Sequence, residues 1–193
     1  MKKALLILTF VVMISGLCTL QAQIVKKYQV KSGIITFENT MTMGKMVMKM
    51  KSVVYFDDYG MKECKETYDM DNSLKESFFS DGKELYLVIP KEKTAYKRGT
   101  AYRGTEYRFD WNEIAPSGKA KKIANMTVVG KNCEAFQLEA GGGTNTYAGW
   151  SNICLYLGVS QKGLSTINKA VKFEENAKIP AEKFKVPAGY AIK

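Results

Sequence analysis

Apolar and polar residues alternate with a period of two along most of the chain after residue 23, which is the pattern of β-strands with one covered face. Residues 28–43 and 45–56 follow this pattern closely and meet at Gly44-Lys45. A glycine in the first position of a two-residue loop suits a type II′ turn, so we predict a hairpin centred there. The predicted register pairs Met43 with Met46, Met41 with Met48, and Asn39 with Met50.

This hairpin gathers five methionines on one face, half of the ten in the chain. Three interpretations remain open. The methionines could be ordinary core residues, they could form a deformable wall of a cavity for a lipid or another apolar ligand, or their thioethers could bind Cu(I) at M-x-M spacing. The alternation of the strands explains that spacing without a metal. The same face also carries Ile35, Phe37, Val54 and Phe56.

Further strands follow. Residues 61–70 are predicted to form a third strand, residues 74–90 a second hairpin about Asp81-Gly82, and residues near 164–175 a late strand. The second turn would place Phe78 opposite Leu85, with Leu74 and Leu87 alongside. Residues 119–129 fit a basic helix or a strand. Short helical segments are expected at 110–115, carrying Trp111, and at 180–184, where Pro180 suits a helix start.

The mature part of the chain has three cysteines, Cys64, Cys133 and Cys154. Residues 131–158 resemble a third hairpin. If its loop centres on Gly143-Thr144, Cys133 lies opposite Cys154, and cross-strand partners can meet the distance requirement of a disulfide. We therefore predict a Cys133–Cys154 disulfide and a leftover thiol at Cys64.

The first 22 residues have the features of a secretory signal peptide. Lys2 and Lys3 precede an apolar run over residues 4–14 that is too short to span a bilayer, and the sequence LQA before Gln23 suits cleavage after Ala22. Leu17 before Cys18 argues against a lipoprotein signal, so a soluble exported protein is expected. Cleavage would leave residues 23–193, the length of one domain, and we expect a monomer.

Charge and composition narrow the function. The chain contains 29 Lys and Arg against 19 Asp and Glu, and it has no histidine. A basic surface fits anionic lipid headgroups or simply a soluble secreted protein, and no nucleic-acid-binding module is present. The missing histidine excludes Ser-His-Asp and Cys-His catalysis and every His-based metal site. We therefore expect neither an enzyme nor a resident metal or cofactor.

The chain combines the amphipathic hairpins with DGKELYLVIPKEKTAYK at 81–97, GKNCEAFQL at 130–138, a strand bearing Trp150 and a terminal FKVPAGY at 184–190. Together these features resemble the periplasmic lipoprotein-carrier superfamily with the LolA/LolB-like fold, in a branch common in Bacteroidetes-type bacteria. The resemblance covers most of residues 28–193. It implies an incomplete antiparallel β-barrel, open on one side, with short helices over an apolar cavity. Family members of known role carry acyl chains of lipoproteins across the periplasm.

Two departures concern the function. Known carriers open with a helix where this chain has predicted strands, and no arginine matches the one that controls their lid, with Arg98, Arg103 and Arg108 as candidates only. The fold class expected is thus mostly antiparallel β with short helices (α+β). The expected role is a periplasmic carrier or binding protein for an acylated or lipid-like ligand, with a possible envelope protein partner. An interaction protein with a closed core is the competing interpretation. The predicted apolar wall consists of Phe37, Met41, Met43, Met46, Met48, Met50, Phe56, Leu85, Leu87 and Trp111.

Overall fold

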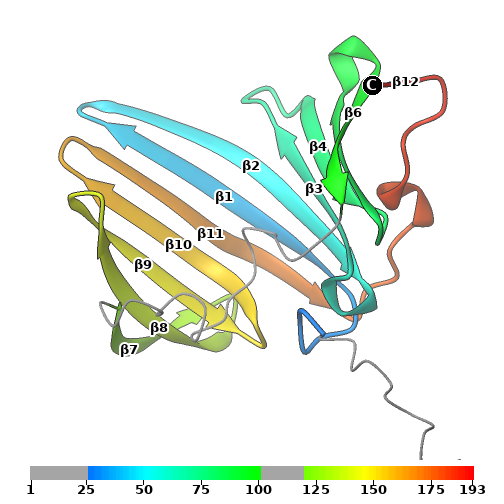
Figure 1. Cartoon of the computed structure of the whole chain (residues 1–193). Coiled ribbons are helices and arrows are strands. Elements are labelled where there is room, and N and C mark those ends of the chain that lie inside the picture. Colours follow the sequence, from blue (N-terminus) through cyan, green and yellow to red (C-terminus); the bar gives the residue numbers. More distant parts are fainter. Residues whose placement is uncertain (1–25, 101–119) are drawn as a thin grey trace, which may run out of the picture.

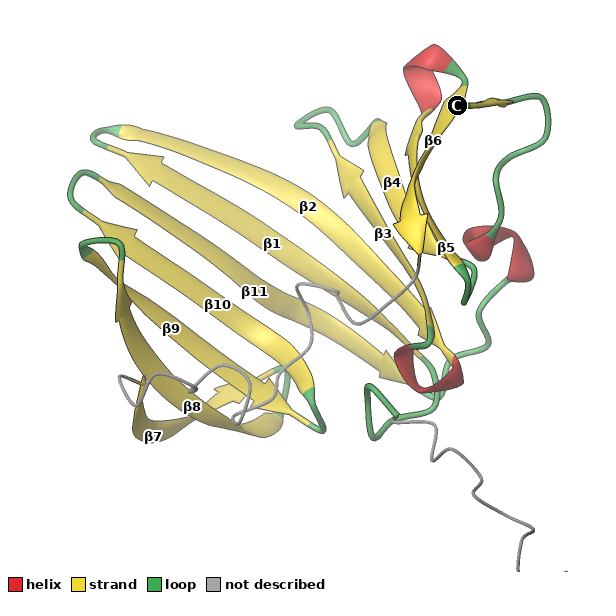
Figure 2. Cartoon of the chain, in the orientation of Figure 1, coloured by secondary structure: helices red, strands yellow, loops and turns green. Residues whose placement is uncertain are grey.

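The computed structural model describes residues 26–100 and 120–193, which form one twelve-stranded, open and mostly antiparallel sheet (Figures 1 and 2). The strand order is β12-β6-β5-β4-β3-β2-β1-β11-β10-β9-β8-β7. Only the short β12–β6 pairing is parallel. The strands are β1 (Gly33–Met43), β2 (Met46–Asp57), β3 (Lys62–Tyr68), β4 (Leu74–Ser80), β5 (Glu84–Ile89), β6 (Thr94–Thr100), β7 (Ala120–Val128), β8 (Lys131–Ala140), β9 (Gly143–Trp150), β10 (Ile153–Gln161), β11 (Leu164–Glu175) and β12 (Ala191–Ile192).

Two runs of consecutive hairpins build the sheet. Strands β1 to β6 pair in chain order, and so do β7 to β11. The runs join where β1 pairs with β11, from Gly33 opposite Glu175 to Met43 opposite Leu164. The long strands of this junction occupy the middle of the sheet, between β7–β9 on one side and β3–β6 on the other (Figure 1).

The described residues contain no α-helix, so the expected α part of the fold class is wrong for this part of the chain. They hold only three 3₁₀ turns: η1 (Asp58–Gly60), η2 (Pro90–Glu92) and η3 (Ala181–Phe184). The helical turn predicted at 180–184 is η3, which begins directly after Pro180. The ambiguous basic stretch forms strand β7. The helix predicted at 110–115 lies outside the described residues. No helix in the described ranges has the length and apolar character needed to span a membrane.

The second predicted hairpin exists as β4–β5, but its register is shifted, so that each β4 residue faces a β5 residue two positions later than predicted. Ser80 lies opposite Leu85 and Phe78 opposite Leu87, instead of Phe78 opposite Leu85. The reason lies in the turn, where the Asp81 carboxylate accepts hydrogen bonds from the backbone N–H groups of Lys83 and Glu84, both at 2.8 Å. These bonds stabilise a longer loop than the two-residue turn that Asp-Gly favours.

The predicted Cys133–Cys154 disulfide is wrong, because none of the three described cysteines forms a disulfide, and all three are buried. Residues 131–161 form three strands, since Ser151 and Asn152 turn the chain a second time with φ of 52° and 63°. Strand β9 therefore separates β8, with Cys133, from β10, with Cys154. The two thiols also pack in different apolar clusters.

The buried apolar side chains form three clusters. The largest joins the start of β1 and the end of β2 to β7–β11 and includes Phe37, Phe56, Ile153 and Leu155. A small cluster surrounds Phe136 on the neighbouring strands. The remaining cluster joins Cys64, Phe79, Val88 and Ala95 of β3–β6 to Phe184 of the C-terminal segment. The C-terminal segment, residues 176–193, thus covers one side of β3–β6 (Figure 1).

A buried carboxylate anchors this C-terminal segment. Glu66 on β3 is 6% exposed and accepts a hydrogen bond from the Tyr68 hydroxyl at 2.6 Å. The Lys183 Nζ lies 2.5 Å from Glu66 Oε1 and 4.3 Å from the centre of the Tyr55 ring. Burial lowers the pKa of Lys183, but the Glu66 carboxylate outweighs burial and leaves this pKa raised. Burial and the Glu66 charge raise the pKa of Cys64 to about 12.

A second buried carboxylate holds the segment before β1. Glu63 is 4% exposed, and its two carboxylate oxygens accept hydrogen bonds from the Tyr28 hydroxyl and the Lys27 ammonium. Tyr28 also packs edge-on against Phe56, with ring centroids 5.0 Å apart. Both flanking segments of the sheet are therefore fastened to β3 through a buried glutamate and a lysine.

Candidate ligand-binding face

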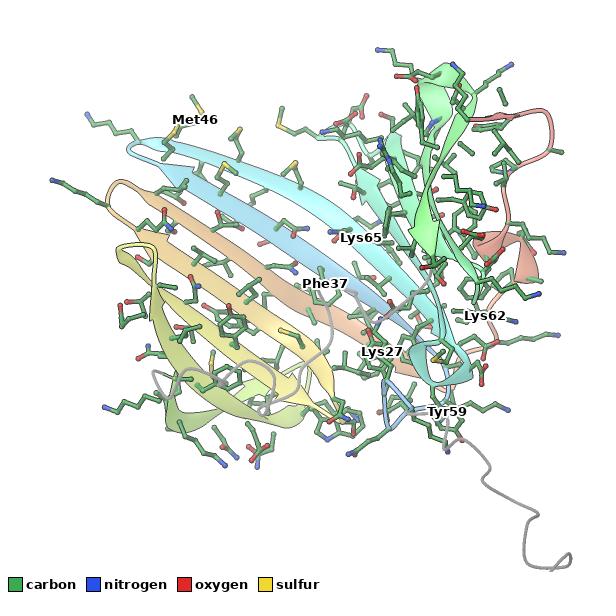
Figure 3. The ribbon with its side chains drawn as sticks, viewed as in Figure 1. Lys27, Phe37, Met46, Tyr59, Lys62 and Lys65 are labelled. Carbon is green, nitrogen blue, oxygen red and sulfur yellow. The ribbon has the colours of Figure 1, made fainter. Side chains whose placement is uncertain are left out.

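The β1–β2 hairpin has the predicted register. Met43 lies opposite Met46, Met41 opposite Met48 and Asn39 opposite Met50. Gly44 adopts a φ of 58°, as the first position of a type II′ turn requires. Met43 and Met46 at the tip are each 54% exposed, while the other three methionines are partly buried. Figure 3 shows Met46 at the tip and Phe37 farther along the sheet.

The methionines belong to a larger apolar surface, because directly opposite residues on neighbouring strands project from the same face. Met41 pairs with Thr166, Thr166 with Val159, and Val159 with Asn145. We call this surface the Met face. It consists of Met46, Met48, Met50, Asn39, Met41, Met43, Leu164, Thr166, Asn168, Gln161, Val159, Leu157, Asn145 and Tyr147.

The Met face carries no charged residue at these positions, but it carries four amides, those of Asn39, Asn145, Gln161 and Asn168. Asn39 donates a hydrogen bond from Nδ2 to Ser52 Oγ at 3.1 Å. Asn168, directly opposite Asn39, and Asn145 on β9 each have a buried Oδ1 without a hydrogen-bond partner among the described residues. The face therefore offers thioethers and aliphatic surface together with two unused acceptors.

The reverse side of the same strands is polar. Thr40 and Thr42 alternate with the β1 methionines, and Lys49 on β2 forms an ion pair with Glu38 at 3.3 Å. Val47, opposite Thr42, is an exposed apolar residue on this side, at 58% exposure. The two sides of the hairpin thus differ in polarity at adjacent positions along the chain.

The structure distributes the predicted wall residues over different environments. Phe37 and Phe56 are 1% and 0% exposed and belong to the largest core cluster. Leu85 and Leu87 are partly buried on β5, and strands β3 and β4 separate them from the methionines. Trp111, like Arg103 and Arg108, lies outside the described residues. The five methionines form one continuous group, and Phe37 lines the same cavity as Met50.

Sequence reasoning missed the part of the Met face beyond β1. Leu157, Val159 and Leu164 alternate with polar neighbours, so the period-two signal was present. Nothing in that local signal shows that β11 pairs with β1, which is what brings these residues beside the methionines.

Two cavities lie near this region. One, of about 260 Å³, is lined by Met50, Lys51, Val171 and residues of the β3–β4 turn, among them Met70. The other, of about 390 Å³, lies between β4–β5 and the C-terminal segment and is lined by Phe79, Tyr86 and Phe184 among others. Of these two, only the first is lined by one of the five methionines, Met50. Within the described ranges, no group of three or more His, Cys, Asp or Glu side chains could hold a metal ion.

No protein-family model and no curated protein matches this chain. Its fold is similar to that of an uncharacterized conserved protein from Thermus thermophilus, with a TM-score of 0.58 and 10% identity over 88% of this chain and 93% of the other. It is also similar to a chain of the MucA/MucB complex from Pseudomonas aeruginosa, with a TM-score of 0.50 and 11% identity over 84% of this chain and 58% of the other.

A third similar structure is a LolA superfamily protein from Nitrosomonas europaea, with a TM-score of 0.40 and 8% identity over 83% of this chain and 92% of the other. The superfamily that the sequence resembles is represented among the similar structures. At these identities the likeness concerns the fold alone, so function has to be argued from the Met face.

Proposed function

We propose that this protein is an exported, non-enzymatic carrier or binding protein that holds an acylated or lipid-like ligand on the Met face within the cell envelope. The observation that carries the proposal is a continuous, uncharged sheet face that ends in two methionines more than half exposed. Exposing two such side chains to water at a hairpin tip is unfavourable, and covering them with an apolar ligand removes this cost.

The energetics suit an acyl chain. Each methylene removed from water contributes about 0.8 kcal/mol, so a chain lying across several strands gains affinity with every carbon that it places on the face. Methionine side chains are unbranched and adapt to irregular ligands. Because the chain is basic overall, with 29 Lys and Arg against 19 Asp and Glu, an anionic headgroup beyond the apolar surface is favoured.

The proposed location follows from residues 1–22, which we propose to be a signal peptide cleaved after Ala22, so that residues 23–193 act as a soluble periplasmic monomer. An acylated protein presents the same chemistry as a lipid, and both are proposed occupants of the face. The Cu(I) interpretation is not favoured, because no observation beyond the spacing supports it, and the alternation of strands β1 and β2 accounts for that spacing.

The test is binding of a fluorescent fatty acid to the purified mature protein, together with native mass spectrometry of protein isolated from its own periplasm. We expect a bound lipid-like mass. We also expect Met43→Asp combined with Met48→Asp to reduce fatty-acid affinity at least tenfold, because two charges then lie on the apolar face. Val47→Asp is the matched control, since it adds a charge to the same hairpin on the polar side.

A clean ligand-free mass, together with fatty-acid affinity unaffected by the two Met→Asp changes, would refute the proposed function. Equal losses in the Val47→Asp control would also count against it, because the effect would then come from charge on the hairpin rather than from the Met face.

A further inference from the structure

Two amides in the Met face have an acceptor that no group of residues 26–100 and 120–193 uses. The Oδ1 atoms of Asn145 and Asn168 are buried and have no hydrogen-bond partner within these ranges. Buried polar atoms in native proteins are nearly always hydrogen-bonded, because an unpaired one loses its solvation without compensation. Two such atoms on one face therefore require a physical reason.

Both amides belong to the part of the sheet where the register is regular. Asn168 lies opposite Asn39 on β1 and opposite Leu157 on β10. Asn145 lies opposite Val159, two residues farther along β10 than Leu157. Strands lie about 4.8 Å apart and rise about 3.3 Å per residue, so the two positions are roughly 12 Å apart. The acceptors are thus two separate positions on the same apolar surface.

The surroundings of these acceptors are apolar and adaptable. Asn168 is flanked across the strands by Leu157 and, beyond Asn39, by Met50. A ligand that spreads over the face displaces the side chains covering the acceptors, and unbranched thioether chains rearrange at low cost. A hydrocarbon placed there leaves both oxygens unpaired, whereas a ligand with an N–H or O–H group satisfies the one that it reaches.

We infer that Asn145 and Asn168 make the Met face selective for acyl ligands whose polar linkage carries a hydrogen-bond donor, either an amide N–H or a hydroxyl. This inference rests on the proposed function, because it assigns the chemistry of the ligand that the face holds. The acyl chain supplies the apolar contact, and the donor selects among acyl compounds of equal length.

The experiment measures how well matched pairs of ligands, all with a twelve-carbon acyl chain, displace a fluorescent fatty acid from the mature protein. N-methyldodecanamide has one N–H group and N,N-dimethyldodecanamide has none. 2-Hydroxyethyl dodecanoate has a hydroxyl group that 2-methoxyethyl dodecanoate lacks. We expect the donor of at least one pair to bind about tenfold more tightly than its partner, the usual effect of one hydrogen bond to an otherwise unpaired group. The pair that shows the difference identifies the source of the donor.

Variants locate the effect. Asn168→Leu and Asn145→Leu keep the branching and the number of side-chain heavy atoms and remove the acceptor, so one or both should reduce the tenfold preference to less than twofold while still binding the donor-free ligands. Gln137→Leu is the control, because Gln137 is an amide on β8 whose Nε2 contacts Thr146 on the polar side, at 3.4 Å.

The outcomes separate the two proposals. Equal displacement by all four ligands, or a preference that persists in both Asn→Leu variants, overturns the donor inference and leaves the proposed function standing. Failure of the fluorescent fatty acid to bind overturns both.

Discussion

The Lys183–Glu66 pair gives the sharpest test of how the C-terminal segment is held. Replacing Lys183 by Met keeps the length of the side chain and removes its charge. Glu66 then remains buried beneath the segment with the Tyr68 hydroxyl as its hydrogen-bond partner. A buried carboxylate without a cation beside it lowers the stability of the folded state, because the surrounding dielectric constant is low.

The magnitude follows from burial. Removing one partner of a fully buried ion pair costs about 3–5 kcal/mol. The Glu66 side chain is 8% exposed, but that of Lys183 is 26% exposed, so solvent already screens part of the attraction. We therefore expect Lys183→Met to lower the free energy of unfolding by about 2 kcal/mol. With a urea m-value of about 2 kcal/mol/M, the midpoint falls by about 1 M.

Urea unfolding followed by circular dichroism measures this shift, and Lys172→Met provides the control. The Lys172–Glu174 pair has nearly the same separation, 2.6 Å against 2.5 Å, but its side chains are 66% and 47% exposed. Its loss should cost less than about 0.5 kcal/mol. Adding Glu66→Gln to Lys183→Met should recover part of the stability, because no buried charge remains. Equal effects of the two lysine changes would refute the reasoning, since burial would then not decide the cost.

Three further predictions follow from buried groups. Gly33→Ala should destabilise the protein by about 1–3 kcal/mol in the same urea assay, because a Cβ there lies 2.7 Å from the Phe56 ring and 2.8 Å from Phe173; an unchanged midpoint would contradict this close packing. Residues 23–193, denatured without reductant, should give three reactive thiols, because none of the described cysteines forms a disulfide; a count of one would restore the predicted disulfide. Burial raises the pKa of Cys64 from 9.0 to about 12, so the thiol ionises at lower pH in the unfolded chain than in the folded one, and stability falls as the pH rises from about 9 to 12. Cys64→Ser should flatten this decline when unfolding is measured as a function of pH. An unchanged slope would assign the decline to other groups.

The sequence was sufficient to predict the Met hairpin, because two independent signals agree there. The alternation sets the faces, and Gly44 sets the turn and with it the register. The late strand at 164–175 was equally readable and agrees with β11. Local pattern determines such elements because neighbouring strands are joined by short loops.

Other features depend on contacts that a local pattern does not contain. The β9–β10 turn places Ser151 and Asn152 in the left-handed region. Asparagine tolerates this conformation, so Asn152 was the available signal for a turn within the stretch predicted as one long strand. The pairing of β1 with β11 and the packing of the C-terminal segment on β3 join residues far apart in sequence. The missed half of the Met face has the same origin, since its residues come from β10 and β11.

The β1–β11 junction has a consequence for the order in which the chain folds. Residue 33 finds its partner only when residue 175 is available, so the edge of β1 that β11 covers stays unpaired until nearly the whole chain has been made. The hairpins on either side can form early, whereas closing this junction fixes a very long loop and is slow. During that interval β1 exposes both an open hydrogen-bonding edge and its methionines, a combination that favours aggregation. A chaperone that binds extended apolar strands would therefore act on this chain at its first strand, before its last strand is available.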